Sequence, residues 1–448
     1  MSKLEKNDLI DWFVSGEKPR EDWKIGTEHE KFVFHQNSFN RVGYFGKSGI
    51  SELLNKLAQK NNWEKILENN NTIALRDHTG ASISLEPGGQ LELSGKPLEN
   101  LHQTCKETGL HLKMMKDVMS ELGLSMIGLG YDPKWSRSDQ NWMPKGRYEI
   151  MKNYMPKVGN LGLDMMLRTC TIQVNLDYFS EQDMVQKFQI SLALQSVATA
   201  LFANSPFIDG QASGYLSSRA MVWTDTDSDR TGVPGIVFDP NFGYESWLNY
   251  ILQVPMYFIY REGKYIDVSG QSFKDFMDGK LIGFEGQYPT IKDWEDHITV
   301  AFPEVRLKQY LEMRGADGGP WNIICALPAL WVGLLYDDQS QSEAFDLAKP
   351  LMDVGMLEEG RISAAKLGLG GKIGENSIEY LATEMLKISS SGLSRRNKLD
   401  KKGIDERQFL DPLFHILQNK ETGAEKLLKN YNNSWSKDIN KIFTESSY

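Results

Sequence analysis

Two glutamates stand one residue apart in the segment IGTEHEKFVF, residues 25–34. In a β-strand, Glu28 and Glu30 would project from the same face, about 7 Å apart. Like charges held this close either take up protons or are neutralised by a cation. Because Mg²⁺ is bound by carboxylates together with substrate phosphates, the pair predicts a metal site. A strand face that is simply exposed to solvent is the alternative interpretation.

Three further segments place polar residues at alternate positions, as strands do when their other face is buried. They are SLEPGGQLE (84–92), TCTIQVNLD (169–177) and YLEMR (310–314). If these strands are neighbours of the first, one sheet face would carry the carboxylates of Glu28, Glu30, Glu86, Glu92 and Glu312. Such a face is a candidate site for a metal ion and a nucleotide, to which Arg314 would add phosphate contacts.

Two arginines lie among aromatic and turn residues, Arg147 in MPKGRYEIM and Arg219 in GYLSSRAMVW. A guanidinium can bind a carboxylate through two parallel hydrogen bonds, so each could clamp a substrate carboxylate. A structural or surface role is the alternative for both.

The elements that must position these residues mix strands with long helices. Apolar spacing predicts helices over residues 1–24, 50–68 and 98–122 and a buried helix within 191–207. Strands are expected at 25–34, 125–130 and 169–177, and Pro87-Gly88-Gly89 marks a turn between two more. Since strands and helices do not alternate regularly, the pattern favours an α+β fold with an antiparallel sheet.

Helical patterns dominate from about residue 340 to the end of the chain. We therefore expect a catalytic sheet core with flanking helices over residues 1–345 and a helical C-terminal region over 346–448. No segment rich in proline and serine separates the two, so the C-terminal region is expected to pack on the core.

The composition narrows the class of protein. The 448 residues carry a formal charge of -10, from 50 basic and 60 acidic side chains, which argues against nonspecific nucleic-acid binding. The first residues lack the apolar region of a signal peptide, and no segment is apolar enough to span a bilayer. Three cysteines do not make a disulfide framework. These observations lead us to expect a cytoplasmic protein without a membrane partner.

Several segments then resemble one family, the plant-type glutamate–cysteine ligases, which are also found in many bacteria. They include IGTEHEKF, SLEPGGQLELSGKPLENLHQTCKE, DMMLRTCTIQVNLD and YLEMRGADGGPW, and the similarity runs from about residue 22 to at least residue 335. The resemblance implies a glutamine-synthetase-like fold, in which the inner face of a curved antiparallel sheet, flanked by helices, binds metals and ATP.

The resemblance also implies roles for individual residues. The family's metal ligands match Glu28, Glu30, Glu86, Glu92 and Glu312, and its catalytic phosphate-binding arginine matches Arg314. Its glutamate-binding arginines match Arg147 and Arg219, and Tyr257, in VPMYF, lies in a matching pocket segment. Gln173 and Asn175 take the place of a polar pair on a neighbouring strand of the nucleotide-binding face.

The implied activity is the first step of glutathione biosynthesis. The γ-carboxylate of L-glutamate would be joined to L-cysteine through a γ-glutamyl phosphate, with ATP as co-substrate and Mg²⁺, or alternatively Mn²⁺, as cofactor. Glutathione is a candidate feedback inhibitor, and family members occur as monomers or homodimers. Cys105 and Cys325 resemble one of the family's regulatory disulfide pairs, although Cys105 also fits the apolar stripe of its helix as a small core residue.

Three other functions stay open from the residues. A related carboxylate–amine ligase would use a different amine acceptor. A metal-dependent hydrolase would use the acidic face to activate water, and it would be active without ATP. A binding module for glutamate or a nucleotide would show no catalytic loss when Glu28 is changed to Gln.

Overall fold

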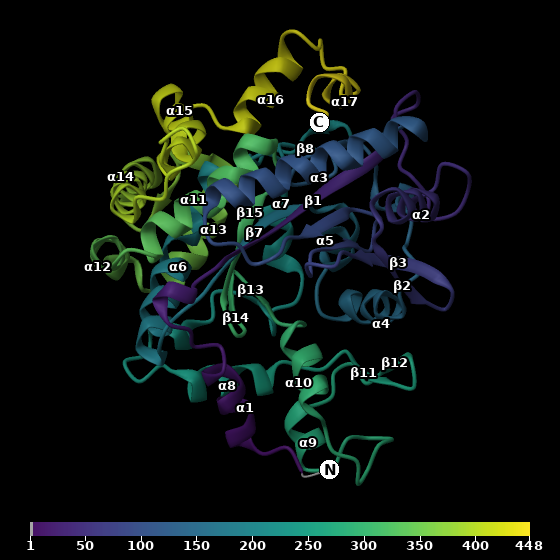
Figure 1. Cartoon of the computed structure of the whole chain (residues 1–448), viewed down its shortest axis with the longest axis vertical. Coiled ribbons are helices and arrows are strands. Elements are labelled where there is room, and N and C mark those ends of the chain that lie inside the picture. The colour runs from purple at the N-terminus through teal and green to yellow at the C-terminus, as the bar shows by residue number, and fades with distance from the viewer. Residues whose placement is uncertain (1–2) are drawn as a thin grey trace.

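A nine-stranded antiparallel sheet forms the centre of the protein, with helices packed around it (Figure 1). The computed structural model describes residues 3–448. The strands run in the order β14-β15-β7-β1-β5-β4-β3-β2, and β6 pairs with the far half of β1. They are β1 (Ile25–His35), β2 (Glu64–Glu68), β3 (Asn71–Arg76), β4 (Ser82–Leu85), β5 (Leu91–Ser94), β6 (Leu124–Ile127), β7 (Thr171–Leu176), β14 (Val305–Leu307) and β15 (Leu311–Asp317). The α+β fold with an antiparallel sheet is confirmed.

Strand β1 is the longest strand of this sheet, and it joins the two halves of the predicted site. Glu28 lies opposite Gln173 of β7, and Glu30 lies opposite Glu92 of β5. The strand alternates as predicted, so His29 and Lys31 project from the other face, where both are fully buried. A single strand therefore carries carboxylates on one face and buried basic side chains on the other.

Two helices predicted from apolar spacing are shorter than expected. The helix predicted over 50–68 ends as α2 (Ile50–Asn61), because Asn62 takes the left-handed conformation (φ 55°) and the chain then continues as β2. The helix predicted over 1–24 is only α1 (Lys6–Val14), followed by a 3₁₀ turn at Arg20–Asp22. Just after α1, Gly16 packs against the backbone of Gln309 too closely to admit a side chain.

The helix predicted over 98–122 is confirmed as α3 (Leu101–Glu121), which Asn100 caps by accepting a hydrogen bond from Gln103 N. The buried helix expected within 191–207 is α6 (Glu181–Leu201), which both starts earlier, after the cap Ser180, and ends earlier than expected. Most of its residues are buried, since it passes through the middle of the largest apolar cluster. Both helices pack on the sheet and hold its strands in place.

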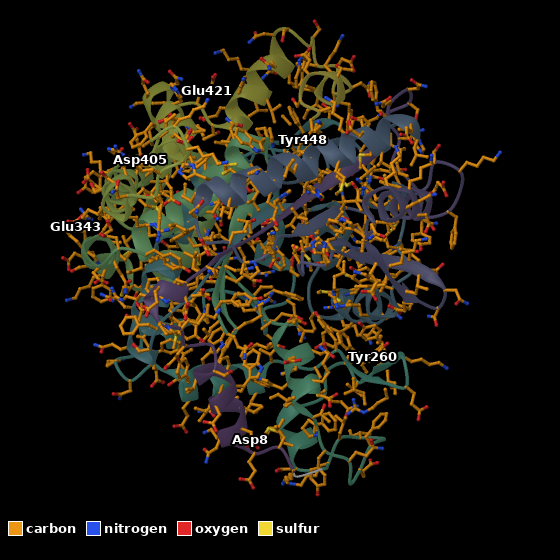
Figure 2. All side chains as sticks on the ribbon, in the orientation of Figure 1. Asp8, Tyr260, Glu343, Asp405, Glu421 and Tyr448 are labelled. Carbon is orange, nitrogen blue, oxygen red and sulfur yellow. The ribbon has the colours of Figure 1, made fainter. Side chains whose placement is uncertain are left out.

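The chain beyond the sheet is mostly helical, as expected. It contains α11 (Trp321–Leu335), α12 (Asp338–Ala348), α13 (Val354–Leu367), α14 (Ile378–Arg396), α15 (Asp411–Asn419), α16 (Gly423–Asn432) and α17 (Lys441–Glu445), with a small hairpin of β16 (Lys372–Ile373) and β17 (Asn376–Ser377). Acidic side chains such as Glu343, Asp405 and Glu421 lie at the periphery of this part (Figure 2). One apolar cluster runs from β7 and β15 through α6 and α11 into α13 and α14. The division at residue 345 stays a proposal, and α12 runs across it.

The remaining elements lie outside this sheet. They are α4 (Gly146–Tyr154), α5 (Gly162–Arg168), α7 (Ser218–Val222), α8 (Tyr244–Gln253), α9 (Phe273–Met277), α10 (Ile291–Ile298), β8 (Phe207–Ile208), β9 (Gln211–Ala212), β10 (Thr231–Gly232), β11 (Phe258–Arg261), β12 (Lys264–Asp267) and β13 (Phe302–Pro303). Among them, α4, α5, α7 and β13 contribute residues to the site described below. None of the helices in residues 3–448 combines the length and apolar character that a membrane crossing requires.

Candidate active site

A cavity of about 270 Å³ opens on the sheet face that carries the predicted carboxylates. We call it the catalytic cavity. It is lined by residues from β1, β7, β15, the β4–β5 hairpin, α4 and α7. Seven residues predicted from the sequence line it together: Glu30, Glu86, Glu92, Arg147, Gln173, Arg219 and Arg314. Segments far apart in the chain thus meet in one place.

Glu28, Asn175 and Glu312 continue the same sheet face beyond the cavity lining. Glu28 Oε1 accepts a hydrogen bond from Asn175 Nδ2 at 2.8 Å, and Asn175 lies opposite Glu312 on β15. The predicted polar face is therefore continuous from β5 across β1 and β7 to β15.

Four of the carboxylates are held in an environment that disfavours their charge. Burial, together with the charges of Glu312 and Glu92, raises the pKa of Glu28 to about 7. Burial also raises the pKa values of Glu30, Glu86 and Glu92, and the negative charge of Glu86 adds to this for Glu30 and Glu92. A cation placed among these groups would relieve the repulsion.

Glu312 is the exception, because three cations already surround it. Burial alone would raise its pKa, but Arg306, Lys308 and Arg314 together hold it well below its usual range. Arg306 Nε and Arg314 Nη1 each donate to Glu312 Oε2 at 2.8 Å, and Lys308 Nζ lies 3.2 Å from Oε1. In this arrangement Glu312 orients Arg314, and its role as a metal ligand stays a prediction.

The donor set fits Mg²⁺ in its chemistry. Carboxylate oxygens are hard ligands, and Mg²⁺ usually needs only one or two of them in addition to phosphates and water. Within residues 3–448, however, no three acidic, histidine or cysteine side chains are grouped closely enough to hold an ion by themselves. A metal here would therefore rely on substrate oxygens to complete its coordination.

The two predicted arginines differ in how freely they can meet a substrate. Arg147 forms no ion pair with any side chain in the described part of the chain, its Nε is buried without a hydrogen-bond partner, and its guanidinium lies 5.2 Å from the centre of the Phe258 ring. Arg219 is 5% exposed, and its Nη2 donates to the carbonyl oxygen of Arg314 at 2.6 Å. Arg147 is thus available for an anionic group, whereas Arg219 also supports β15.

Tyr257, predicted as a substrate-binding residue, does not line the catalytic cavity. It is 1% exposed and packs under the guanidinium of Arg230, 3.9 Å from the ring centre, with its hydroxyl 3.5 Å from Met155 Sδ. Its neighbours Val254, Met256 and Phe258 are buried too, so the apolar segment VPMYF forms core behind the site rather than its wall.

Sequence reasoning missed part of the cavity wall. Lys145 lines it, and its Nζ donates to Leu85 O at 2.7 Å and to Tyr148 Oη at 3.2 Å. Burial lowers the pKa of Lys145, while the nearby charge of Glu86 opposes this. Lys145 stands two residues before Arg147 in the sequence, and this closeness to a predicted site residue could have identified it as part of the cavity wall. An apolar wall was also missed, made by Met151, Met165, Met166, Trp223 and Phe302, because such residues are more often core.

Cys105 and Cys325 face each other between α3 and α11. Both are buried free thiols in the structure. Burial, and next the neighbouring thiol of Cys325, raise the pKa of Cys105, and the helices that carry the two cysteines pack against each other. The expected pair is thus brought together, but its oxidation stays a prediction.

The chain is similar over almost its whole length to known glutamate–cysteine ligases. The model of "Glutamate-cysteine ligase family 2" matches residues 24–445. The glutamate–cysteine ligase A of Oryza sativa subsp. indica, named chloroplastic, is 51% identical over 448 residues, which cover 99% of this chain and 88% of the relative. The chloroplastic enzymes of Medicago truncatula and Arabidopsis thaliana are each 50% identical, and the matches cover 99% of this chain and 85% and 83% of those proteins.

A solved structure supports the fold. The crystal structure of the Francisella tularensis glutamate–cysteine ligase in complex with AMP matches with a TM-score of 0.52 and 13% identity, covering 96% of this chain and 89% of that one. The similarity in structure persists at low sequence identity, as expected for a shared fold.

The expectation of a cytoplasmic protein is wrong. The relatives that match almost the whole chain are named chloroplastic. A protein without a secretory signal peptide and with few cysteines can also belong to an organelle or to another compartment with reduced thiols. These two observations therefore could not single out the cytoplasm.

Proposed function

The chain belongs to glutamate-cysteine ligase family 2, and from this premise we propose that it joins the γ-carboxylate of L-glutamate to the amine of L-cysteine at the expense of ATP. One observation carries the proposal: the catalytic cavity combines carboxylates that need a cation with arginines that can bind an anion. A site of that kind suits a reaction between anionic substrates.

The chemistry begins with activation of a poor acyl donor. A carboxylate does not react with an amine until its oxygen is converted to a leaving group. The γ-carboxylate of glutamate therefore attacks the terminal phosphorus of ATP, ADP leaves, and γ-glutamyl phosphate forms. The cysteine amine then attacks the acyl carbon, and inorganic phosphate leaves as the amide bond forms. The proton lost from the nitrogen passes to the departing phosphate or to a carboxylate of the pocket.

The carboxylate-rich face would neutralise the phosphates. We propose that Glu28, Glu30, Glu86 and Glu92 hold Mg²⁺, with Mn²⁺ as an alternative and Glu312 as the least free ligand. When bound, the metal would screen the negative charge of the phosphates. Arg314, held at 2.8 Å by Glu312, is positioned to stabilise the charge of the transferred phosphoryl group.

Two arginines of the cavity lining, one from α4 and one from α7, would hold glutamate. Arg147 has a free guanidinium in the cavity and is our first candidate for a substrate carboxylate, with Arg219 as the second. Gln173 is uncharged, and its Oε1 accepts a hydrogen bond from Arg314 Nη1 at 2.9 Å. Gln173 therefore helps to orient that arginine. Asn175 plays the same part for Glu28.

A coupled assay of ADP release tests this function. We expect ADP and phosphate only with glutamate and a divalent cation present, and an increase when cysteine is added. A panel of other amines in place of cysteine distinguishes this activity from that of a ligase with another acceptor. Hydrolysis of a substrate without ATP, or no ADP above background with glutamate and cysteine, would contradict the proposal.

Regulation and assembly are also proposals. The proximity of the buried thiols of Cys105 and Cys325, on the packed helices α3 and α11, supports a disulfide that forms under oxidising conditions. Feedback inhibition by glutathione and a monomeric or homodimeric state follow from the family resemblance, and enzyme assays and sedimentation would test them.

A further inference from the structure

Asp317, the last residue of β15, is a buried carboxylate that the proposed reaction does not use. It is 1% exposed and does not line the catalytic cavity. Its Oδ2 accepts hydrogen bonds from Ser205 Oγ at 2.6 Å and from Asn204 N at 2.8 Å, and its Oδ1 accepts one from Ser217 Oγ at 2.8 Å. These three bonds offset the cost of burying the carboxylate. Asp317 is thus held by two hydroxyl groups and one backbone amide.

Both hydroxyl groups that donate to Asp317 also accept a hydrogen bond from the first turn of α7. Ser217 caps this helix, and its Oγ accepts from Ala220 N at 3.1 Å. Ser205 Oγ accepts from Arg219 N at 3.3 Å. A hydroxyl has a single proton, so donating it to Asp317 leaves the oxygen lone pairs free for the N–H groups of the helix. Asp317 therefore fixes the direction in which both hydroxyls bond, and through them the start of α7.

Helix α7 depends on such support because it is very short. It has five residues, Ser218–Val222, far fewer than an isolated helix needs for stability in water. It packs on β15 (Figure 1), and its one charged residue is Arg219. Arg219 lines the catalytic cavity, and its Nη2 also donates to the carbonyl oxygen of Arg314 at 2.6 Å. The position of this guanidinium therefore depends on how the first turn of α7 is held.

Charge and space also connect Asp317 with Arg219. Burial raises the pKa of Asp317, and the charge of Arg219 is the largest effect that opposes this. Burial lowers the pKa of Arg219, and the charge of Asp317 is likewise the largest opposing effect. Gly130 leaves room for the carboxylate, since a Cβ at that position would overlap it. The carboxylate thus packs against backbone, and each of the two charges stabilises the other.

We propose that Asp317 is a positioning residue for the glutamate-binding arginine: its carboxylate orients the hydroxyls of Ser205 and Ser217, and these hold α7 so that Arg219 faces the substrate carboxylate. The inference rests on the proposed function, because it takes L-glutamate as the ligand of Arg219. Asp317 itself touches no substrate, so its effect is on the affinity for glutamate. An asparagine of the same size does not replace it, because one of the surrounding groups would then meet an NH₂ donor instead of an acceptor.

Steady-state kinetics of Asp317→Asn in the ADP-release assay test the proposal, with glutamate and ATP varied in turn. We expect the KM for glutamate to rise at least about fivefold and the KM for ATP to change by less than about threefold. A purely structural role would lower the free energy of unfolding and the amount of active enzyme but leave the KM for glutamate unchanged. Asp183→Asn is the matched control, because Asp183 is also buried, at 4% exposed, and does not line the catalytic cavity. Both of its KM values should stay within about twofold of those of the wild type.

A double-mutant cycle shows whether Asp317 acts through Arg219. In an Arg219→Ala background, Asp317→Asn should change the KM for glutamate by less than about twofold, because the side chain that it positions is gone. Full multiplication of the two effects would overturn the proposal, as would an unchanged KM for glutamate in Asp317→Asn. Should Asp317→Asn fail to fold, Ser217→Ala removes one of the two hydroxyls. It should raise the KM for glutamate at least about threefold and show the same dependence on Arg219, and an unchanged KM there would equally overturn the proposal.

Isothermal titration of L-glutamate separates this inference from the proposed function. The wild type should bind glutamate, and Asp317→Asn should bind it at least about fivefold more weakly. Glutamate binding by a wild type that releases no ADP would contradict the ligase function, while the ratio of the two affinities would still decide the role of Asp317. Equal affinities would overturn this inference and leave the ligase function standing. A wild type that neither binds glutamate nor releases ADP in its presence would overturn both.

Discussion

The free guanidinium of Arg147 and the paired one of Arg219 show how differently two residues of one type can serve a site. Arg147 has no partner for its buried Nε and can bind an anion, whereas Arg219 already donates a hydrogen bond to the backbone carbonyl of Arg314. Similarly, Glu312 lies on the same sheet face as Glu28 and yet has the opposite electrostatic situation, because Arg306 of β14 and Lys308, just after that strand, pair with it. At this scale the neighbours of a charged group decide its role more than its type does.

Arg219→Ala should raise the KM for glutamate by about tenfold or more, because a charge-assisted contact to a carboxylate is lost. The KM for ATP should change by less than about threefold. Initial-rate kinetics with each substrate varied in turn would show the difference. Tyr257→Phe serves as the control, since Tyr257 does not line the catalytic cavity and its hydroxyl lies against Met155, so neither KM should move. An unchanged glutamate KM in Arg219→Ala would remove this residue from the binding site.

Strands β7 and β1 could be predicted because the alternation of polar and apolar residues is visible within each strand's own short segment. Strict alternation along TCTIQVNLD is readable in nine residues, and it assigns Gln173 and Asn175 to one face without knowledge of the partners. The cations around Glu312 could not be found in this way, since the pairing of Arg306 with Glu312 depends on how β14 and β15 align. Trp63 was assigned to a helix because a short apolar segment fits either period.

The crossing of α11 and α14 holds the helical C-terminal part against the core. A Cβ at Gly392 would overlap the carbonyl oxygen of Gly333, and one at Gly333 would overlap Ser389. Gly392→Ala should therefore lower the free energy of unfolding by about 1–3 kcal/mol through overpacking. Urea denaturation measures the loss. Gly370→Ala, where nothing lies within 4 Å, should change it by less than about 0.5 kcal/mol. Equal effects of both changes would show that the crossing is not tightly packed.

The free thiols of Cys105, on α3, and Cys325, on α11, lie in the same region, where the two helices pack together. We expect a mild oxidant to lower the mass of the chain by two hydrogens and to protect both thiols from alkylation. Intact-mass analysis before and after reduction would detect this. Cys105→Ser should abolish the change in mass. Three alkylated thiols in the oxidised protein would exclude the disulfide.

For the molecule as a whole, the buried carboxylates make stability depend on pH and metal together. A carboxyl group whose pKa is raised from 4.5 to about 7 by folding, as that of Glu28 is, binds its proton more tightly in the folded state. The free energy of unfolding of the metal-free protein therefore falls as pH rises from about 4.5 to about 7. A bound cation favours the ionised carboxylate and therefore restores the free energy of unfolding that the metal-free protein loses as pH rises.

Glu28→Gln should accordingly stabilise the metal-free protein at about pH 8, by about 1–2 kcal/mol given partial solvent access to the carboxylate, and change it little at about pH 4. Millimolar Mg²⁺ with ATP should stabilise the wild type more than Glu28→Gln. Thermal unfolding at the two pH values, with and without the metal, gives all four comparisons. A wild type that is more stable than the variant at about pH 8 without metal would contradict this account.

The alternation along β1 also bears on which changes in length the chain can tolerate. Each face of this strand serves a different environment, carboxylates toward the catalytic cavity and His29 with Lys31 under α3. Inserting one residue between Ile25 and Glu28 would exchange the two sets, burying two acids beneath the helix and turning two basic groups toward the phosphates. Inserting two would restore the correct order. Natural variation in length near this strand is therefore expected to occur in even steps, or outside the strand altogether.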